Sequence, residues 1–157
     1  MNETESLVPE GFVPIPHQSR FSRHLGTIFM PEGTTDDSVA AENLVIIGFL
    51  LKEPHTGGPG RGHGGVTMTL LDEAMGRAAS IAVDAMCVTI SMTTNFCQST
   101  RIGDFIQMQA RVIRQGKNIV FVDGELLDSR GKLVASATGT WNNTGIPIPG
   151  RDNNDPG

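Results

Sequence analysis

Apolar side chains recur at three- and four-residue spacing from Gly64 to about Asp84, and this spacing predicts one long helix. No proline interrupts the segment, and its alanines and methionines are good helix formers. The predicted apolar face consists of Val66, Leu70, Leu71, Ala74, Ala78, Ile81 and Ala82.

Two neighbouring acids lie in the middle of this predicted helix. Glu73 precedes Arg77 by four residues, the favourable order for a pair of charges on a helix surface, so we expect Glu73 to be solvated. Asp72 lies on another stripe, together with Gly76 and Ala79. A glycine inside a helix costs roughly 1 kcal/mol relative to alanine, which is reasonable where a neighbour approaches closely. The spacing leaves open whether Asp72 faces that neighbour or water.

Alternation of apolar and polar residues after the helix predicts four β-strands, joined by short links that favour an antiparallel meander. Two earlier segments are also rich in strand formers. A single long helix is the one large apolar element available to cover such a sheet. We therefore expect an α+β fold, with an antiparallel sheet of five or six strands wrapped around one long central helix. The predicted strands are 25–30, 41–53, 86–98, 104–115, 118–128 and 132–141.

The outer parts of the chain have few periodic apolar positions. Residues 1–24 are interpreted as an N-terminal extension and residues 25–141 as the domain itself. Residues 142–157 are rich in asparagine, glycine and proline and are expected to be a disordered tail.

Composition narrows the class of protein. The 157 residues are enough for one domain with a sizeable core. A formal net charge of −5 argues against general nucleic-acid binding, which needs clustered lysine and arginine. No apolar run is long enough for a membrane span, and the N-terminus lacks the features of a secretion signal, so we expect a cytoplasmic protein. Cys87 and Cys97 fall in one predicted strand, too far apart for a disulfide.

The segment before the helix is unusually flexible, because six of the nine residues from Gly57 to Gly65 are glycine. It lacks the lysine of a nucleotide-binding loop, and the spacing of His55, His63 and Asp72 does not favour a metal site. A helix start presents unpaired backbone N–H groups. At Gly64 and Gly65 such groups suit a carbonyl oxygen that gains negative charge, while a nearby carboxylate activates water or attacks directly. This combination predicts acyl transfer to water; alternatively, the glycines only permit a tight turn.

Gly64 and Asp72 cannot act together on one helix, since eight residues span roughly 12 Å. Two helices that run antiparallel across a two-fold axis would bring Gly64 of one copy to Asp72 of the other. We therefore expect a homodimer with composite sites at its interface.

The segments HGGVTMTLLDEAMGRAA, VTISMTTNF and GDFIQMQARVIRQGKNIVFVDGELLDSRGKLVASATGT resemble the PaaI-like (4-hydroxybenzoyl-CoA thioesterase) superfamily of hot-dog-fold acyl-CoA thioesterases. The resemblance covers roughly residues 42–141. It implies an antiparallel sheet around a central helix, assembly as homodimers or dimers of dimers, and hydrolysis of acyl-CoA thioesters at subunit interfaces. It implies no cofactor and no metal.

The resemblance also assigns roles by position. Asp72 matches the catalytic carboxylate, which serves as general base or nucleophile, and Gly64 matches the glycine whose N–H polarises the thioester carbonyl. His63 stands beside Gly64 in the same motif, and Thr89 falls where some members place a serine that helps to hold the water. The residues expected to contact substrate are Gly57, Gly65, Arg114, Gly116, Lys117 and Asn118, of which the last four match the region that meets the CoA phosphates.

One position departs from the family pattern. Gly57 stands six residues before His63, where the family commonly has an asparagine that contacts the substrate carbonyl and water. Either the neighbouring His55 replaces that asparagine, or the site is slow, differently tuned or inactive. The alternative function is a non-catalytic acyl-CoA-binding or regulatory domain. The sequence does not define the acyl group, whose pocket depends on side chains such as Met68, Met75, Met92 and Phe96.

Overall fold

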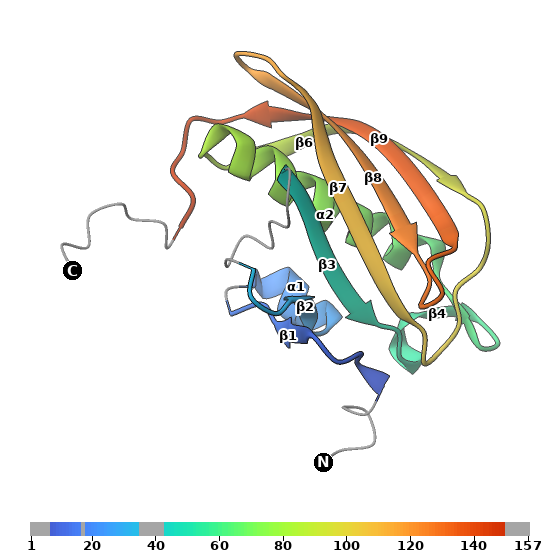
Figure 1. The fold of residues 1–157 in the computed structure, drawn as a ribbon. Coiled ribbons are helices and arrows are strands. Elements are labelled where there is room, and N and C mark those ends of the chain that lie inside the picture. Colours follow the sequence, from blue (N-terminus) through green and yellow to red (C-terminus); the bar gives the residue numbers. More distant parts are fainter. Residues whose placement is uncertain (1–6, 17, 35–42, 150–157) are drawn as a thin grey trace.

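The structure, a computed structural model, describes residues 7–16, 18–34 and 43–149. One long helix, α2, lies along the concave face of a curved antiparallel sheet (Figure 1). The elements in chain order are β1 (Phe12–Pro14), α1 (Arg20–Leu25), β2 (Ile28–Pro31), β3 (Leu44–Leu50), the short 3-10 helix η3 (Glu53–His55), β4 (Thr56–Gly58), β5 (Arg61–Gly62), α2 (Gly64–Val83), β6 (Cys87–Phe96), β7 (Phe105–Gln115), β8 (Ile119–Leu127) and β9 (Leu133–Asn143).

The large sheet has seven strands in the order β1-β2-β3-β7-β8-β9-β6, and β4 and β5 form a separate hairpin. The expected hot-dog architecture and central helix are confirmed, whereas the expected number of five or six strands is too low. The additional strand is β1, which pairs with β2. Three residues in a proline-rich segment carry too little alternation to be recognised as a strand from sequence.

The four strands after α2 do not form one continuous meander. β7, β8 and β9 follow one another in the sheet, but β6 pairs with β9 at the far edge and not with β7. Residues 97–104, which join β6 to β7, form the longest of the three links and carry the chain across the end of the sheet. As a result β6 is an edge strand that flanks α2 on the side opposite β3.

The core lies between α2 and the concave face of the sheet. Leu70, Leu71, Ala74 and Met75 on the helix are fully buried, and each large side chain buried in this way stabilises the fold by about 1.5–3 kcal/mol. Gly124 on β8 has a packing reason, because a Cβ there would lie 2.7 Å from the sulfur of Met75. Inward-facing residues alternate with exposed ones along β8, as its sequence predicts.

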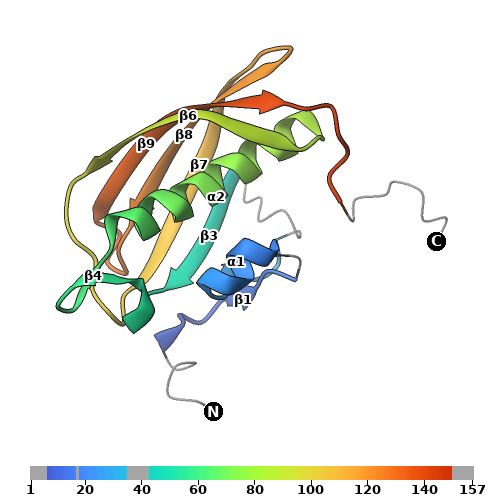
Figure 2. The same cartoon turned by 180° about the vertical axis from the view of Figure 1, so that it is seen from behind.

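The region before β3 packs against the domain. Figure 2 shows α1 beside α2 with β1 below it. Ser22 on α1 is buried and donates its hydroxyl hydrogen to Glu73 at 2.9 Å. Glu73 is therefore half-buried under α1, and the expectation of a solvated Glu73 is wrong. Burial lowers the pKa of the neighbouring Arg77, and the charge of Glu73 opposes that shift.

The domain boundaries stay predictions, although several contacts bear on them. β9 continues to Asn143, and Met86 exchanges backbone hydrogen bonds with Thr144 and Ile146. Residues 150–157 of the expected tail, and residues 1–6 and 17 of the expected extension, lie outside the described residues. Among the described helices, none is long and apolar enough to cross a membrane. Cys87 and Cys97 are both free.

Candidate active site

The first turn of α2 presents a free backbone donor at Gly64. His63 is the N-cap residue, and its Nδ1 accepts the N–H of Gly65 at 2.8 Å. The N–H of Gly65 is therefore used by the N-cap, whereas the N–H of Gly64 makes no hydrogen bond to any described residue. The positive end of the helix dipole adds to the attraction of this N–H for an oxygen with negative charge.

The His63 ring is seated between two glycines. A Cβ at Gly57 would lie 2.6 Å from Cδ2 of the ring, and a Cβ at Gly65 would lie 2.8 Å from Nδ1. Because Nδ1 accepts a hydrogen bond, the neutral ring carries its hydrogen on Nε2. Within the described residues Nε2 has no partner, so it is a second free donor at the start of α2.

Asp72 lies in the middle of α2 on the side that faces β6. Its carboxylate is half-buried, and the hydroxyl of Thr89 on β6 donates to Oδ1 at 2.7 Å. The spacing leaves open whether Asp72 faces a neighbour or water. The contact with Thr89 shows that Asp72 faces the edge strand β6. The structure also brings Thr89 to Asp72, two residues that the resemblance places in one site.

The two halves of the expected site are apart in one chain. Gly64 and Asp72 are eight residues apart on one helix, which is about 12 Å. The edge strand β6 runs alongside this part of α2, from Thr89 at Asp72 to Phe96 at Gly64. It carries exposed apolar side chains, since Val88, Ile90 and Phe96 are 55%, 54% and 53% exposed. The ring of Phe96 borders Gly64, with 3.5 Å from its Cε1 to a Cβ built there. An exposed apolar edge of this kind marks an interaction surface.

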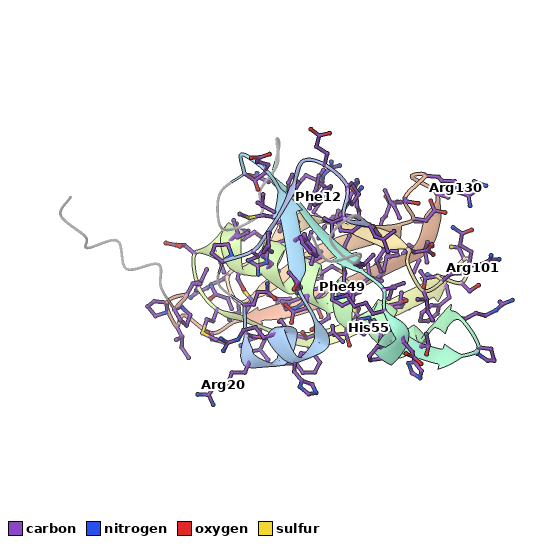
Figure 3. All side chains as sticks on the ribbon, turned by 90° about the horizontal axis from the view of Figure 1, so that it is seen from below. Phe12, Arg20, Phe49, His55, Arg101 and Arg130 are labelled. Carbon is purple, nitrogen blue, oxygen red and sulfur yellow. The ribbon has the colours of Figure 1, made fainter. Side chains whose placement is uncertain are left out.

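His55 does not replace the absent asparagine. It is 6% exposed, its Nδ1 accepts the N–H of Lys52 at 2.9 Å, and its Nε2 lies 2.8 Å from the carbonyl oxygen of Leu25. Its ring packs at a tilt against that of Phe49, with 4.9 Å between the centroids. Both residues are labelled in Figure 3. His55 therefore has a structural role. No group of three or more His, Cys, Asp or Glu in the described ranges could hold a metal ion.

The small residues on the Asp72 stripe pack within the chain. Ala79 is fully buried, and a Cβ at Gly76 would lie 3.2 Å from Nε1 of Trp141 on β9. The neighbour that approaches Gly76 closely is therefore the sheet of the same chain, and not the helix of a second copy.

The residues expected to meet the CoA phosphates lie at the other end of the helix. The turn between β7 and β8 holds Gly116, Lys117 and Asn118, with Arg114 just before it. The carbonyl oxygen of Asn118 accepts a hydrogen bond from Asn143, which pairs with Cys87 just after α2. Since α2 has 20 residues, the turn is about 30 Å from Gly64 along the helix axis.

Comparisons with known proteins agree with the fold and with the motif. Residues 60–135 match the model of the thioesterase superfamily. Human acyl-coenzyme A thioesterase 13 is 31% identical over 76% of this chain and 82% of its own length. The crystal structure of zebrafish thioesterase superfamily member 2 aligns with a TM-score of 0.69 at 27% identity, over 82% of this chain and 89% of that one. A Streptococcus mutans protein solved with acetyl-CoA bound aligns with a TM-score of 0.64 at 28% identity, over 70% of this chain and 89% of that one. The chain therefore belongs to the thioesterase superfamily, a family of thioester hydrolases.

Proposed function

We propose that the protein hydrolyses acyl-CoA thioesters to the free acid and CoA. The N–H of Gly64 binds the thioester carbonyl oxygen and stabilises the negative charge that develops on it. Asp72 of a second copy removes a proton from water as the water oxygen bonds to the carbonyl carbon. The carbon–sulfur bond then breaks, and the CoA thiolate leaves and takes up a proton. In the alternative route the Asp72 carboxylate attacks the carbonyl carbon first, the carbon–sulfur bond breaks with loss of the CoA thiolate, and water then hydrolyses the resulting anhydride.

The observation that carries this proposal is the hydrogen bond from Thr89 to Asp72, next to an edge that no described residue covers. Thr89 fixes one carboxylate oxygen at 2.7 Å and leaves the other free for water. Together with the free N–H of Gly64, this supplies a base and an oxyanion donor, the two groups that thioester hydrolysis needs.

The 12 Å separation within one chain requires a second copy. In a homodimer whose two α2 helices run antiparallel at β6, each Asp72 reaches the Gly64 of the other copy. The exposed apolar side chains of β6 favour this interface, because pairing of two edge strands removes them from water. Dimers of dimers would leave the same composite sites intact.

His63 takes the role that a polar side chain at residue 57 would have. Its Nε2–H is the side-chain donor beside Gly64, and Gly57 leaves room for the ring. The absence of a side chain at residue 57 is therefore compatible with catalysis, and it is the feature that otherwise favours a non-catalytic acyl-CoA-binding domain.

Gly57→Ala tests this arrangement. Its Cβ would overlap the His63 ring, so we expect a lower kcat and a loss of stability of about 1–3 kcal/mol. The matched control is Gly58→Ala, because a Cβ at Gly58 has no atom within 4 Å. Initial rates and thermal unfolding of both variants decide the point; equal rates in the two variants would contradict the role of the ring.

The carrier of the acyl group is proposed to be CoA. The relative from Streptococcus mutans was solved with acetyl-CoA, and Arg114 and Lys117 are exposed at a turn that the antiparallel dimer brings towards the Gly64 end of the partner. Packing explains the glycine at residue 116, since a Cβ there would lie 2.8 Å from the carbonyl oxygen of Ile119.

The direct test is release of CoA from a panel of acyl- and aryl-CoA thioesters, followed with a thiol reagent. Protein without substrate is the necessary blank, because Cys97 is exposed and reacts with the reagent. We expect turnover of at least one thioester. Binding of the panel without any release of CoA would support the non-catalytic domain instead.

A further inference from the structure

Three arginines, Arg61, Arg101 and Arg130, lie at the end of the molecule where α2 begins, although the chain as a whole carries a net charge of −5. A polar depression of about 200 Å³ lies there, between the β6–β7 link and the β8–β9 turn. Figure 3 shows the labelled side chains of Arg101 and Arg130 at this end of the molecule, and that of Arg20 at the opposite end. The lining residues are Gln98, Ser99, Arg101, Asp104, Asp128, Ser129 and Arg130.

The two carboxylates in the depression are held by the backbone. Asp104 accepts the N–H of Arg101 at 2.7 Å, and Asp128 accepts those of Arg130 and Lys132 at 2.9 Å each. The hydrogen bond from Lys132 is the main cause that keeps the pKa of Asp128 below its usual value. Both acids thus shape the loops, and Asp128 also accepts a hydrogen bond from Nε2 of Gln98 at 3.3 Å. Among the described residues neither acid lies within salt-bridge distance of Arg101 or Arg130, although the positive charge of Arg130 contributes to the lowered pKa of Asp128.

The guanidinium groups are accessible to a ligand. Both arginines are exposed, and the described residues give neither side chain a hydrogen bond. Arg61 adds a third positive charge at the rim, where its Nη1 donates to Ser99 at 3.2 Å and its backbone bridges to Arg101. Arginine side chains beside a depression that also carries serine hydroxyls suit phosphate oxygens, which accept paired N–H donors.

The depression is joined to the tip of α2. The N–H of Gly62, two residues before Gly64, donates to the carbonyl oxygen of Thr100 at 3.0 Å. Thr100 lies between Ser99 and Arg101, so the same link carries the depression and anchors the hairpin that leads into the helix. A ligand that has its carbonyl at Gly64 can therefore extend along this link.

We propose that Arg101 and Arg130 bind a phosphate group at the nucleotide end of the thioester substrate, at a site distinct from the β7–β8 turn. This inference rests on the proposed function, because it takes the thioester carrier to be CoA. It assigns the phosphate contact to the chain that supplies Gly64, whereas Arg114 and Lys117 would reach the substrate from the other copy.

The test compares three substrates with the same acyl group: the CoA thioester, the 3′-dephospho-CoA thioester and the pantetheine thioester. For Arg101→Ala/Arg130→Ala we expect KM for the CoA thioester to rise about tenfold or more, with kcat unchanged. KM for the pantetheine thioester should not change. If KM rises for the CoA thioester alone, the arginines bind the 3′-phosphate. If KM also rises for the 3′-dephospho-CoA thioester, they bind the diphosphate.

The matched control is Arg20→Ala/Arg23→Ala, which removes the same charge from α1 and should leave all three KM values as in the wild type. The inference is overturned if the Arg101/Arg130 variant changes no KM, or changes KM equally for the CoA and pantetheine thioesters. It is also overturned if only Arg114→Ala/Lys117→Ala raises KM for the CoA thioester.

Calorimetry with CoA and with 3′,5′-ADP separates this inference from the proposed function. If the protein hydrolyses none of the thioesters but binds CoA, and the Arg101/Arg130 variant binds it at least tenfold more weakly, the phosphate site stands and hydrolysis fails. Equal binding by wild type and variant, or no binding by either, overturns the phosphate site.

Discussion

Asp72→Asn lowers kcat for thioester hydrolysis by about 10²–10⁴-fold, the usual cost of removing a general base. The amide has nearly the same shape as the carboxylate, and its oxygen can still accept the hydroxyl hydrogen of Thr89. The fold should therefore survive, while the group that takes the proton from water is lost. Steady-state rates, with unfolding curves for the variant, measure the effect.

Glu73→Gln is the matched control, since it removes an acid at the next position of the same helix. Glu73 accepts its hydrogen bond from Ser22 on α1 and faces away from β6. We expect Glu73→Gln to affect stability and to leave kcat close to the wild-type value. If Asp72→Asn keeps a rate close to that of Glu73→Gln, Asp72 has no part in the chemistry.

Gly64→Pro removes the oxyanion donor and keeps the helix, and we expect it to lower kcat by about 10²–10³-fold. Proline is favoured at the first position of a helix, where no intrahelical bond uses the N–H. The preceding residue, His63, has φ −73° and ψ 135°, a conformation that proline allows before it. The substitution thus replaces the N–H by a methylene group without a reason for the helix to unwind.

Gly64→Ala retains the N–H and adds the side-chain carbon alone. The ring of Phe96 lies at ordinary contact distance, 3.5 Å, from that carbon. We expect kcat within a few-fold of the wild type. The ratio of the kcat values of the alanine and proline variants then isolates the contribution of the N–H. Similar losses in both variants would mean that bulk at residue 64, and not the donor, limits the rate.

Much of the fold follows from the periodicity of the sequence. The apolar spacing between Gly64 and Asp84 predicts α2 to within a residue at its C-terminal end, and the alternation after it predicts β6 to β9. The order of the strands in the sheet does not follow from periodicity, because alternation shows which face of a strand is buried but not which strand lies beside it. The link 97–104 is long enough to cross the end of the sheet. Its length, and not the strand pattern, is the sequence feature that allows β6 and β7 to lie apart in the sheet.

The sequence likewise predicts only part of the candidate site. Glycine at the start of a helix and an acid one stripe away are visible in the sequence, and they identify Gly64 and Asp72 as candidates. The roles of His55 and Gly57 depend on packing across the fold, since His55 binds Leu25 through contacts that no spacing reveals. Arg101 and Arg130 could not be predicted as neighbours from the sequence, because loop residues follow no regular spacing. Only the fold brings them to one depression.

The central claim is that each site takes its donor from one copy and its acid from the other. A heterodimer of Asp72→Asn and Gly64→Pro chains, purified through two different tags, tests it most directly. Such a heterodimer has one site with both groups intact and one with neither, so we expect about half of the wild-type activity, while both parent homodimers stay near background. If the verified heterodimer is as inactive as its parents, Gly64 and Asp72 do not act across an interface.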